Sequence, residues 1–401
     1  MVERQAKAAR NSTRRLLLKG AGAVTVLVAG GLAWRAWDQD LLTDPTSRAA
    51  FSGWRDWNDG RQVGPMAMVA AGILAASPHN TQPWRFVVRA DRIDVHATPD
   101  RNLGAFDPYR RELHTALGCA IENMCLAAPR QGLAVTTTPL SDGAAETGVA
   151  RLALSPTAEL AERDVLAGAI GRRHTDRRAY DVKRDVSEPV LTALTGFATD
   201  PNVRLLLFPR ATAQGQEFGQ ATIDATRSIV ADTEMDGWSK RWTRHASRDV
   251  DRYRDGLTLA CAGLSPVMRV AGEMLPEQSA AGDGEYWLAM TRDTQIPTAA
   301  AFGMILVRDP AGLGDALGAG RLWQRLHLAG TVLGLAMQPL NQVVELVDRE
   351  QALAQPPAMR ERLAALVGDA VWRPTFGFRL GYRDGAAPVS PRRSLESVIG
   401  V

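Results

Sequence analysis

Two apolar segments rich in glycine and alanine, 202 residues apart, place the strongest constraint on the fold of this 401-residue chain. Gly118 opens the first segment and Gly320 the second, and a Leu-Ala pair and a Gly-Leu pair follow each glycine at the same offsets. Apolar residues in helical spacing, with small residues between them, predict two helices that can pack closely against a neighbour. The chain therefore contains two related halves, unless two alanine-rich helices match by coincidence.

Length and composition agree with a chain of two units. A chain of this length, 45% hydrophobic, can bury a large core and exceeds a typical single domain. The net charge of +3 does not indicate a nucleic-acid partner, because residues 1–19 carry +5 and the rest of the chain −2. The three cysteines are too few and too scattered for a disulfide scaffold or a metal site.

The stretch from Ala75 to Phe86 concentrates polar side chains between a helix-like run at 66–74 and a strand-like run at 86–88. A loop in this position is a common place for a ligand-binding surface. Its amide groups suit the edge of a planar heterocycle, and its prolines stiffen the backbone. The alternative is a turn whose polar groups cap the neighbouring helix. The candidate binding residues are Ser77, Pro78, His79, Asn80 and Gln82.

Two arginine-rich segments lie far from this loop in the sequence. Residues 172–178 contain four arginines and a threonine, and residues 392–393 are a second basic pair. Guanidinium groups pair with the oxygens of a dianionic phosphate, and a hydroxyl adds a donor. The alternatives are a solvated basic helix end and a solvent-exposed charged tail. The candidate phosphate ligands are Arg173, Thr175, Arg177, Arg392 and Arg393.

The loop resembles the signature of the nitroreductase superfamily, in which a Pro-Ser-x-x-Asn-x-Gln-Pro-Trp-like loop lies against FMN. His79 and Thr81 depart from it, since small hydroxyl residues are commoner there. Residues 173–177 resemble the superfamily's Arg-Arg-Ser-x-Arg element, which holds the FMN phosphate, with His174 in place of an arginine. The resemblance implies FMN as cofactor and extends to the basic pair near the C-terminus.

Nitroreductases are usually homodimers with flavin sites at the subunit interface, and this chain resembles the single-chain, Acg-type branch in which two subunits are fused. The resemblance implies an α+β, nitroreductase-like fold of two fused repeats, an intramolecular pseudo-dimer with mixed β-sheets flanked by helices. We expect a connecting region at 36–63, a first half at 64–160 and a second half at 161–401. An insertion at 228–280 is either a lid or a peripheral helical addition. Because each half has only part of a site, we expect one FMN per chain.

Residues 1–35 have the organisation of an export signal. Arg14 and Arg15 precede an uncharged run from Gly20 to Trp34, which resembles a twin-arginine signal. This pattern predicts passage through the export machinery to the periplasm or cell envelope. The leader would be cleaved or would remain as a membrane tether through residues 16–34. A cytoplasmic location is the alternative.

The chain shows no nucleophile–base pair, metal-ligand cluster or NTPase phosphate loop. We therefore expect an FMN-dependent oxidoreductase that reduces a small molecule, a nitro compound or a quinone, in two-electron steps. NAD(P)H is the expected electron donor if the protein is cytoplasmic. The alternative is an exported protein that binds or sequesters FMN with little turnover.

Overall fold

The computed structural model describes residues 45–140, 147–157, 165–264 and 280–400. The predicted leader, residues 1–35, lies outside the described residues, as does part of the 228–280 insertion. No helix in the described ranges combines the length and the apolar character that a membrane crossing requires.

The first sheet is built mainly from the front of the chain. Its strand order is β11-β1-β2-β4-β3. β11 pairs parallel with β1, whereas the other pairs are antiparallel, so this sheet is mixed. Its strands are β1 (Trp84–Val88), β2 (Arg92–Ala97), β3 (Leu133–Pro139), β4 (Gly148–Pro156) and β11 (Ile399–Gly400).

The second sheet is antiparallel throughout, in the order β5-β8-β10-β9. Every residue of the central strand β8 is buried, because helices cover both of its faces and its sequence, AFGMILV, is continuously apolar. The α+β class predicted from the sequence is confirmed. The strands are β5 (Val203–Pro209), β8 (Ala301–Val307), β9 (Leu335–Pro339) and β10 (Arg373–Tyr382).

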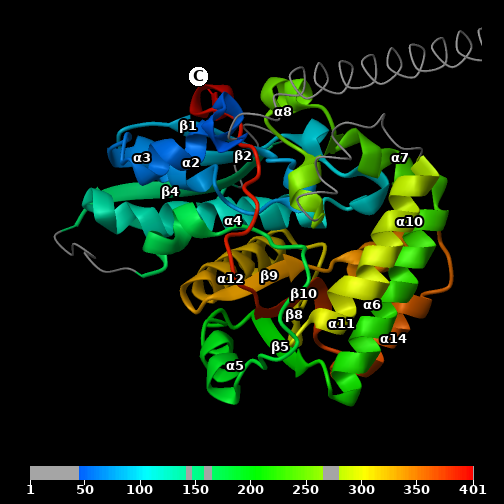
Figure 1. Cartoon of the computed structure of the whole chain (residues 1–401). Helices are drawn as coiled ribbons and strands as arrows, with labels where there is room; N and C mark the ends of the chain where they lie inside the picture. Colours follow the sequence, from blue (N-terminus) through cyan, green and yellow to red (C-terminus); the bar gives the residue numbers. More distant parts are fainter. Residues whose placement is uncertain (1–44, 141–146, 158–164, 265–279, 401) are drawn as a thin grey trace, which may run out of the picture.

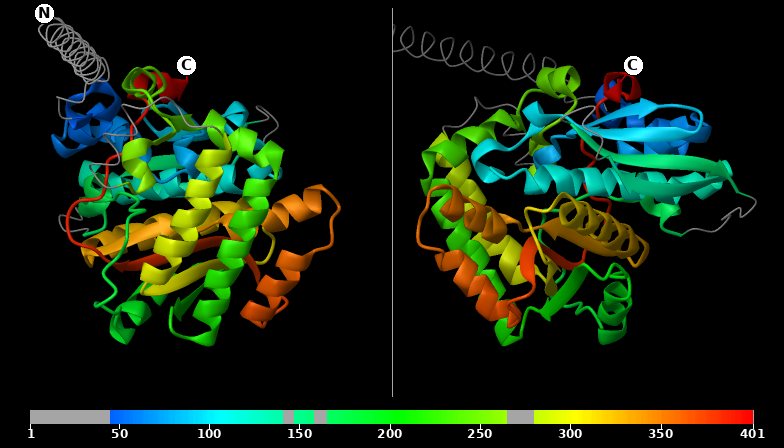
Figure 2. Two further views of the ribbon diagram at one scale, coloured as in Figure 1. Left: turned by 45° about the vertical axis from the view of Figure 1, so that its right-hand side comes forward. Right: turned by 180° about the vertical axis from the view of Figure 1, so that it is seen from behind.

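Helices α4 (Arg111–Ala127) and α12 (Leu313–Val332) pack against each other between the two sheets (Figures 1 and 2). A Cβ atom on Gly118 would lie 2.2 Å from the Leu317 carbonyl oxygen, and one on Gly320 would lie 2.0 Å from that of Thr115. The two contacts are reciprocal under a shift of 202 residues, as expected where equivalent surfaces meet about a two-fold axis. Glycine at both positions therefore lets the backbones touch.

Further helices cover one edge of the molecule, where Figure 1 shows α6, α10 and α14 side by side. α3 packs on α4, and α7 continues from α6. The helices around the α4–α12 pair include α3 (Gly64–Gly72), α6 (Ala213–Ala231), α7 (Thr233–Arg241), α8 (Ser247–Tyr253), α10 (Ala280–Met290), α13 (Gln342–Ala352) and α14 (Ala358–Val367).

After β10 the chain leaves the second sheet and returns to the first (Figure 1, red). α15 (Leu395–Val398) follows, and β11 then pairs with β1. The last strand of the expected second half thus completes the sheet of the first half. This crossing carries the C-terminal arginines to the polar loop that precedes β1.

Candidate functional site

A cavity of about 510 Å³, within the size range of small-molecule sites, is lined by residues from both of the expected halves. Its walls come from the polar loop, α4, the arginine-rich segment, the 228–280 insertion and the C-terminal segment. The structure therefore brings together segments that are remote in sequence. The predicted site residues that line the cavity are Ser77, Pro78, His79, Asn80, Arg173, Thr175, Arg177 and Arg392.

The polar loop has a strained backbone. His79, Asn80 and Gln82 have φ angles of 44°, 56° and 51°, in the left-handed region that glycine usually occupies. Each such residue costs about 1–2 kcal/mol, so tertiary contacts must hold the loop. Strain of this kind clusters at binding sites.

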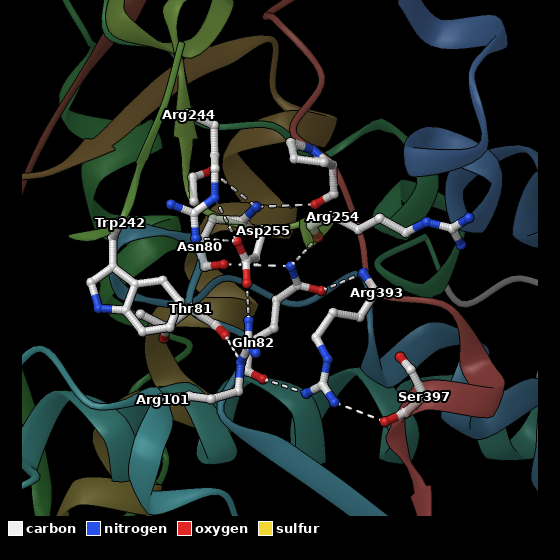
Figure 3. Close-up of polar contacts among 12 residues, drawn as sticks. Asn80, Thr81, Gln82, Arg101, Trp242, Arg244, Arg254, Asp255, Arg393 and Ser397 are labelled. Carbon is white, nitrogen blue, oxygen red and sulfur yellow. Dashed lines mark hydrogen bonds and ion pairs between the residues drawn. The ribbon is translucent and has the colours of Figure 1, made fainter. Parts of the chain in front are cut away.

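Hydrogen bonds from other segments hold the loop in this shape (Figure 3). The Asn80 side-chain amide donates to the carbonyl oxygens of Gly256 and Pro391, and its oxygen accepts from Arg392 at 2.9 Å. The Gln82 amide donates to the Arg254 carbonyl at 2.8 Å, and its oxygen accepts from the Arg393 backbone N–H at 2.8 Å.

Gln82 and Arg393 do not line the cavity, unlike the other predicted site residues. The Arg393 guanidinium donates to the backbone oxygens of Gln82 and Ser397 (Figure 3). It also donates to the backbone oxygen of Trp84. Both side chains are used to join the loop to the C-terminal segment. Their direct contact with a cofactor stays a prediction.

Arg173 is 2% exposed and is held by neutral groups. It donates to the Leu74 carbonyl at 3.0 Å and faces Nδ1 of His327 at 3.2 Å. His327 Nε2 lies 3.3 Å from the His174 carbonyl, so the neutral tautomer with the proton on Nε2 satisfies both contacts. Burial lowers the pKa of His327, which favours that neutral form, and burial lowers the pKa of Arg173 to about 10.

Arg392 and Arg177 are the other two predicted arginines that line the cavity. Arg392 is 3% exposed, lies 4.6 Å over the Trp54 ring and donates to Asn80 and Ser390. Its pKa is lowered well below the usual value by burial and by the nearby Arg173 charge. Arg177 donates to the Cys261 carbonyl at 3.1 Å, and burial lowers its pKa.

Within the described ranges, none of these three guanidinium groups forms an ion pair with a carboxylate. The Nε atoms of Arg173 and Arg392 are buried without a hydrogen-bond partner. Guanidinium groups close to one another on a cavity wall, without carboxylate partners, favour an anion there. The group that best matches this donor set is a phosphate.

His174, at the position where the resembled element has an arginine, does not line the cavity. Its ring packs edge-on against Trp54 with centroids 4.4 Å apart. Burial and the two neighbouring arginines lower the pKa of His174 to about 3, so it stays neutral. It supports the wall without adding to its charge.

The described part of the 228–280 insertion supplies a wall of the cavity. The wall includes residues from the end of α6, from α7 and from the segment that follows α8. The described part of the insertion therefore contributes to the cavity wall, and its role as a lid stays a prediction. His245 is half-buried on this wall.

Sequence reasoning missed a carboxyl group pair on the cavity wall, Glu112 of α4 and Glu345 of α13. Burial raises the pKa of Glu112 to about 7 and raises that of Glu345 well above its ordinary value. Glu112 lies in the first turn of a helix, where an acidic residue is common because it interacts favourably with the helix dipole. Only its burial beside a second carboxyl group marks it as unusual.

Comparisons with known proteins find two similar curated proteins. The chain is 26% identical over 343 residues to a Mycobacterium tuberculosis protein named as a candidate NAD(P)H nitroreductase, covering 83% of this chain and 90% of the relative. A protein of the same name from a second M. tuberculosis strain matches equally. No protein-family model matches the chain.

Solved structures similar to this chain include the FMN-dependent nitroreductase NfnB of Mycobacterium smegmatis in complex with NADPH. It has a TM-score of 0.37 and 18% identity, over 58% of this chain and 97% of NfnB. A Bacteroides fragilis nitroreductase with bound FMN has a TM-score of 0.34 and 13% identity, over 60% of this chain and 98% of the other.

Proposed function

We propose that this chain is an FMN-dependent oxidoreductase of the nitroreductase superfamily that reduces nitro compounds or quinones with a nicotinamide electron donor. One observation carries the proposal: buried arginines without carboxylate partners in the described residues converge with the strained loop on one cavity. The names of the M. tuberculosis relatives support the same reaction class.

Arg173, Arg177, Arg392 and Thr175 would hold the FMN phosphate, and the loop from Ser77 to Asn80 would flank its ring. Three cavity-lining arginines without carboxylate partners in the described residues fit a phosphate, which accepts several charge-assisted hydrogen bonds. When bound, FMN would supply the redox chemistry. The side chains of this chain bind and orient it and keep water from the cavity.

The division of the site between the two halves supports a fused pseudo-dimer of the Acg type with one FMN per chain. The loop lies before β1 and the arginines lie after residue 172, as in a dimer whose subunits each give part of a site. The reciprocal contacts of Gly118 and Gly320 support the same origin.

Flavin stoichiometry of the purified full-length protein tests the proposal. We expect yellow protein with about one FMN per chain, bleaching by NADPH and recovery of colour on adding a nitroaromatic or a quinone. Colourless protein that takes up no FMN contradicts it.

FMN storage is the second candidate function, and the contribution of the insertion to the cavity wall favours it. A storage protein would keep one FMN that NADPH does not bleach. For the leader, outside the described residues, we propose twin-arginine export, with cleavage or tethering through residues 16–34. Cell fractionation tests this: wild-type protein in the cell envelope or periplasm, and an Arg14→Lys, Arg15→Lys variant retained in the cytoplasm.

A further inference from the structure

One face of α4 forms a continuous strip of the cavity wall. A carboxyl group lies at one end of this strip, and the other end lies near a guanidinium group. Glu112, Thr115, Ala116 and Cys119 are spaced at i, i+3, i+4 and i+7, and all line the cavity. Cys119 lies near enough to Arg173 for that charge to lower its pKa, against the larger effect of burial. Seven residues of helix span about 10 Å, so the carboxyl end is separate from the guanidinium end.

At the carboxyl end, Glu112 and Glu345 are 2% and 5% exposed, both line the cavity, and their side chains lie close enough to interact. Two ionised carboxylates have only acceptors, so a hydrogen bond between them requires a proton. Burial of the two carboxyl groups at one cavity wall therefore favours at least one proton on the pair.

The charges around the pair favour retention of this proton. Arg111 donates from Nε to Asp348 at 2.8 Å and lies 3.4 Å from Glu112. Asp107 accepts from the backbone N–H groups of Glu112 and Leu113. One guanidinium thus faces four carboxyl groups, so burial and mutual repulsion oppose full ionisation.

The other charged groups on this part of the cavity come from the covering helices. Asp236 of α7 is paired with Lys240 at 2.8 Å, and Asp283 of α10 also lines the cavity. The neighbours of Glu345 on α13 that line the cavity, Asn341 and Gln342, are neutral. No described cation other than Arg111 forms an ion pair with the Glu112–Glu345 pair.

We propose that Glu112 and Glu345 are the proton donor of this site and pass their shared proton to an oxygen of the bound quinone or nitro compound. This inference rests on the proposed function. For a quinone, NAD(P)H and one proton give NAD(P)⁺ and the hydroquinone. NAD(P)H supplies the electron pair with one hydrogen, as the equivalent of a hydride, while a carboxyl O–H bond breaks and a substrate O–H bond forms with the other. Water then returns a proton to the ionised pair.

Infrared spectroscopy of the full-length protein tests the proton without any flavin. We expect a protonated-carboxyl C=O band at neutral pH that disappears as the pH rises, and that is lost in Glu112→Gln and Glu345→Gln. Glu361→Gln makes the same change at an exposed carboxyl on α14 and keeps the band. A wild-type protein without such a band, or variants that retain it, overturns the proposal.

Rapid kinetics with menadione tests delivery. Both glutamine variants should retain FMN and be bleached by NADPH at the wild-type rate. Their reoxidation by menadione should be slower by about 10²–10⁴-fold, the usual contribution of a general acid. Wild-type reoxidation should slow as the pH rises through the range in which the infrared band is lost, and the Glu112→Gln rate should not follow that profile.

The outcomes separate the two proposals. Yellow, NADPH-reducible variants that reoxidise as fast as wild type, with the same pH profile, overturn the proton donor and leave the proposed function intact. Colourless wild-type protein overturns the proposed function and removes the reaction that the proton would serve.

Discussion

The side chain that best shows the tension between stability and function is Arg173. It is buried with neutral partners, although a buried charge is stable only when it is well paired. An anionic ligand would supply the missing partner. The burial of this unpaired cation destabilises the free protein, and we therefore expect an anion that pairs with it to bind more tightly.

Replacement of this guanidinium should weaken FMN binding specifically. Arg173→Ala removes a charge-assisted contact of about 1.5–3 kcal/mol, so the dissociation constant should rise about 10- to 100-fold. Arg172→Ala is the matched control, because Arg172 is the exposed neighbour and does not line the cavity. Flavin-fluorescence titration measures both, and equal affinities for the two variants would contradict the phosphate assignment.

Gln82 should matter for stability more than for binding. Gln82→Ala leaves the Arg254 carbonyl and the Arg393 N–H without these partners, at a cost of about 1–3 kcal/mol. We expect a lower midpoint in urea denaturation with unchanged flavin stoichiometry at low temperature. Loss of flavin from a variant of wild-type stability would instead place Gln82 in contact with the cofactor.

Among the elements, the α4–α12 pair determines how the halves meet. The glycine contacts are with backbone carbonyls, which cannot move aside as a flexible side chain can. Gly118→Ala and Gly320→Ala should each lower the free energy of unfolding by about 1–3 kcal/mol or more, despite the better helix propensity of alanine.

Gly314, near the start of α12, provides the control for this pair. No atom lies within 4 Å of a Cβ built there. Gly314→Ala should stabilise the protein by up to about 1 kcal/mol through helix propensity alone. Chemical denaturation compares the three variants, and equal effects at the three positions would contradict close packing at the crossing.

For the whole molecule, the pH dependence of stability reflects two opposing sets of buried groups. Burial lowers the pKa of His79, His174 and His327, so the unfolded chain binds more protons below the ordinary histidine pKa and stability falls on acidification. Glu112 and Glu345 have raised pKa values, so their contribution is present at low pH and is lost as the pH rises.

Replacing Glu112 removes one of the two opposing effects on the pH dependence of stability, so the effect of the histidines should become easier to see. Glu112 contributes on the order of 2 kcal/mol more at about pH 5.5 than at about pH 8, given a folded pKa of about 7. Between these two pH values, the free energy of unfolding of Glu112→Gln should therefore rise about 2 kcal/mol more than that of wild type. Urea denaturation at both pH values measures this, and parallel curves would contradict a proton on Glu112.

Much of the local structure could be predicted because it depends on neighbours in the chain. The helix expected after Gly118 lies within α4, the one after Gly320 lies within α12, and the Gly-Leu turns lead into β3 and β9. The loop at 75–86 was identified from its own density of polar groups. Cys119, Cys125 and Cys261 are free thiols in the structure.

By itself, the sequence determined which segments are helices and strands and which arginines and amides are candidates for the site. These depend on side-chain type and periodicity. Only the tertiary structure decided that Gln82 and Arg393 bind each other, that His327 holds Arg173, and that Glu112 meets Glu345. Each of these joins segments far apart in the chain, and the burial that alters the pKa values exists only once those segments have packed together.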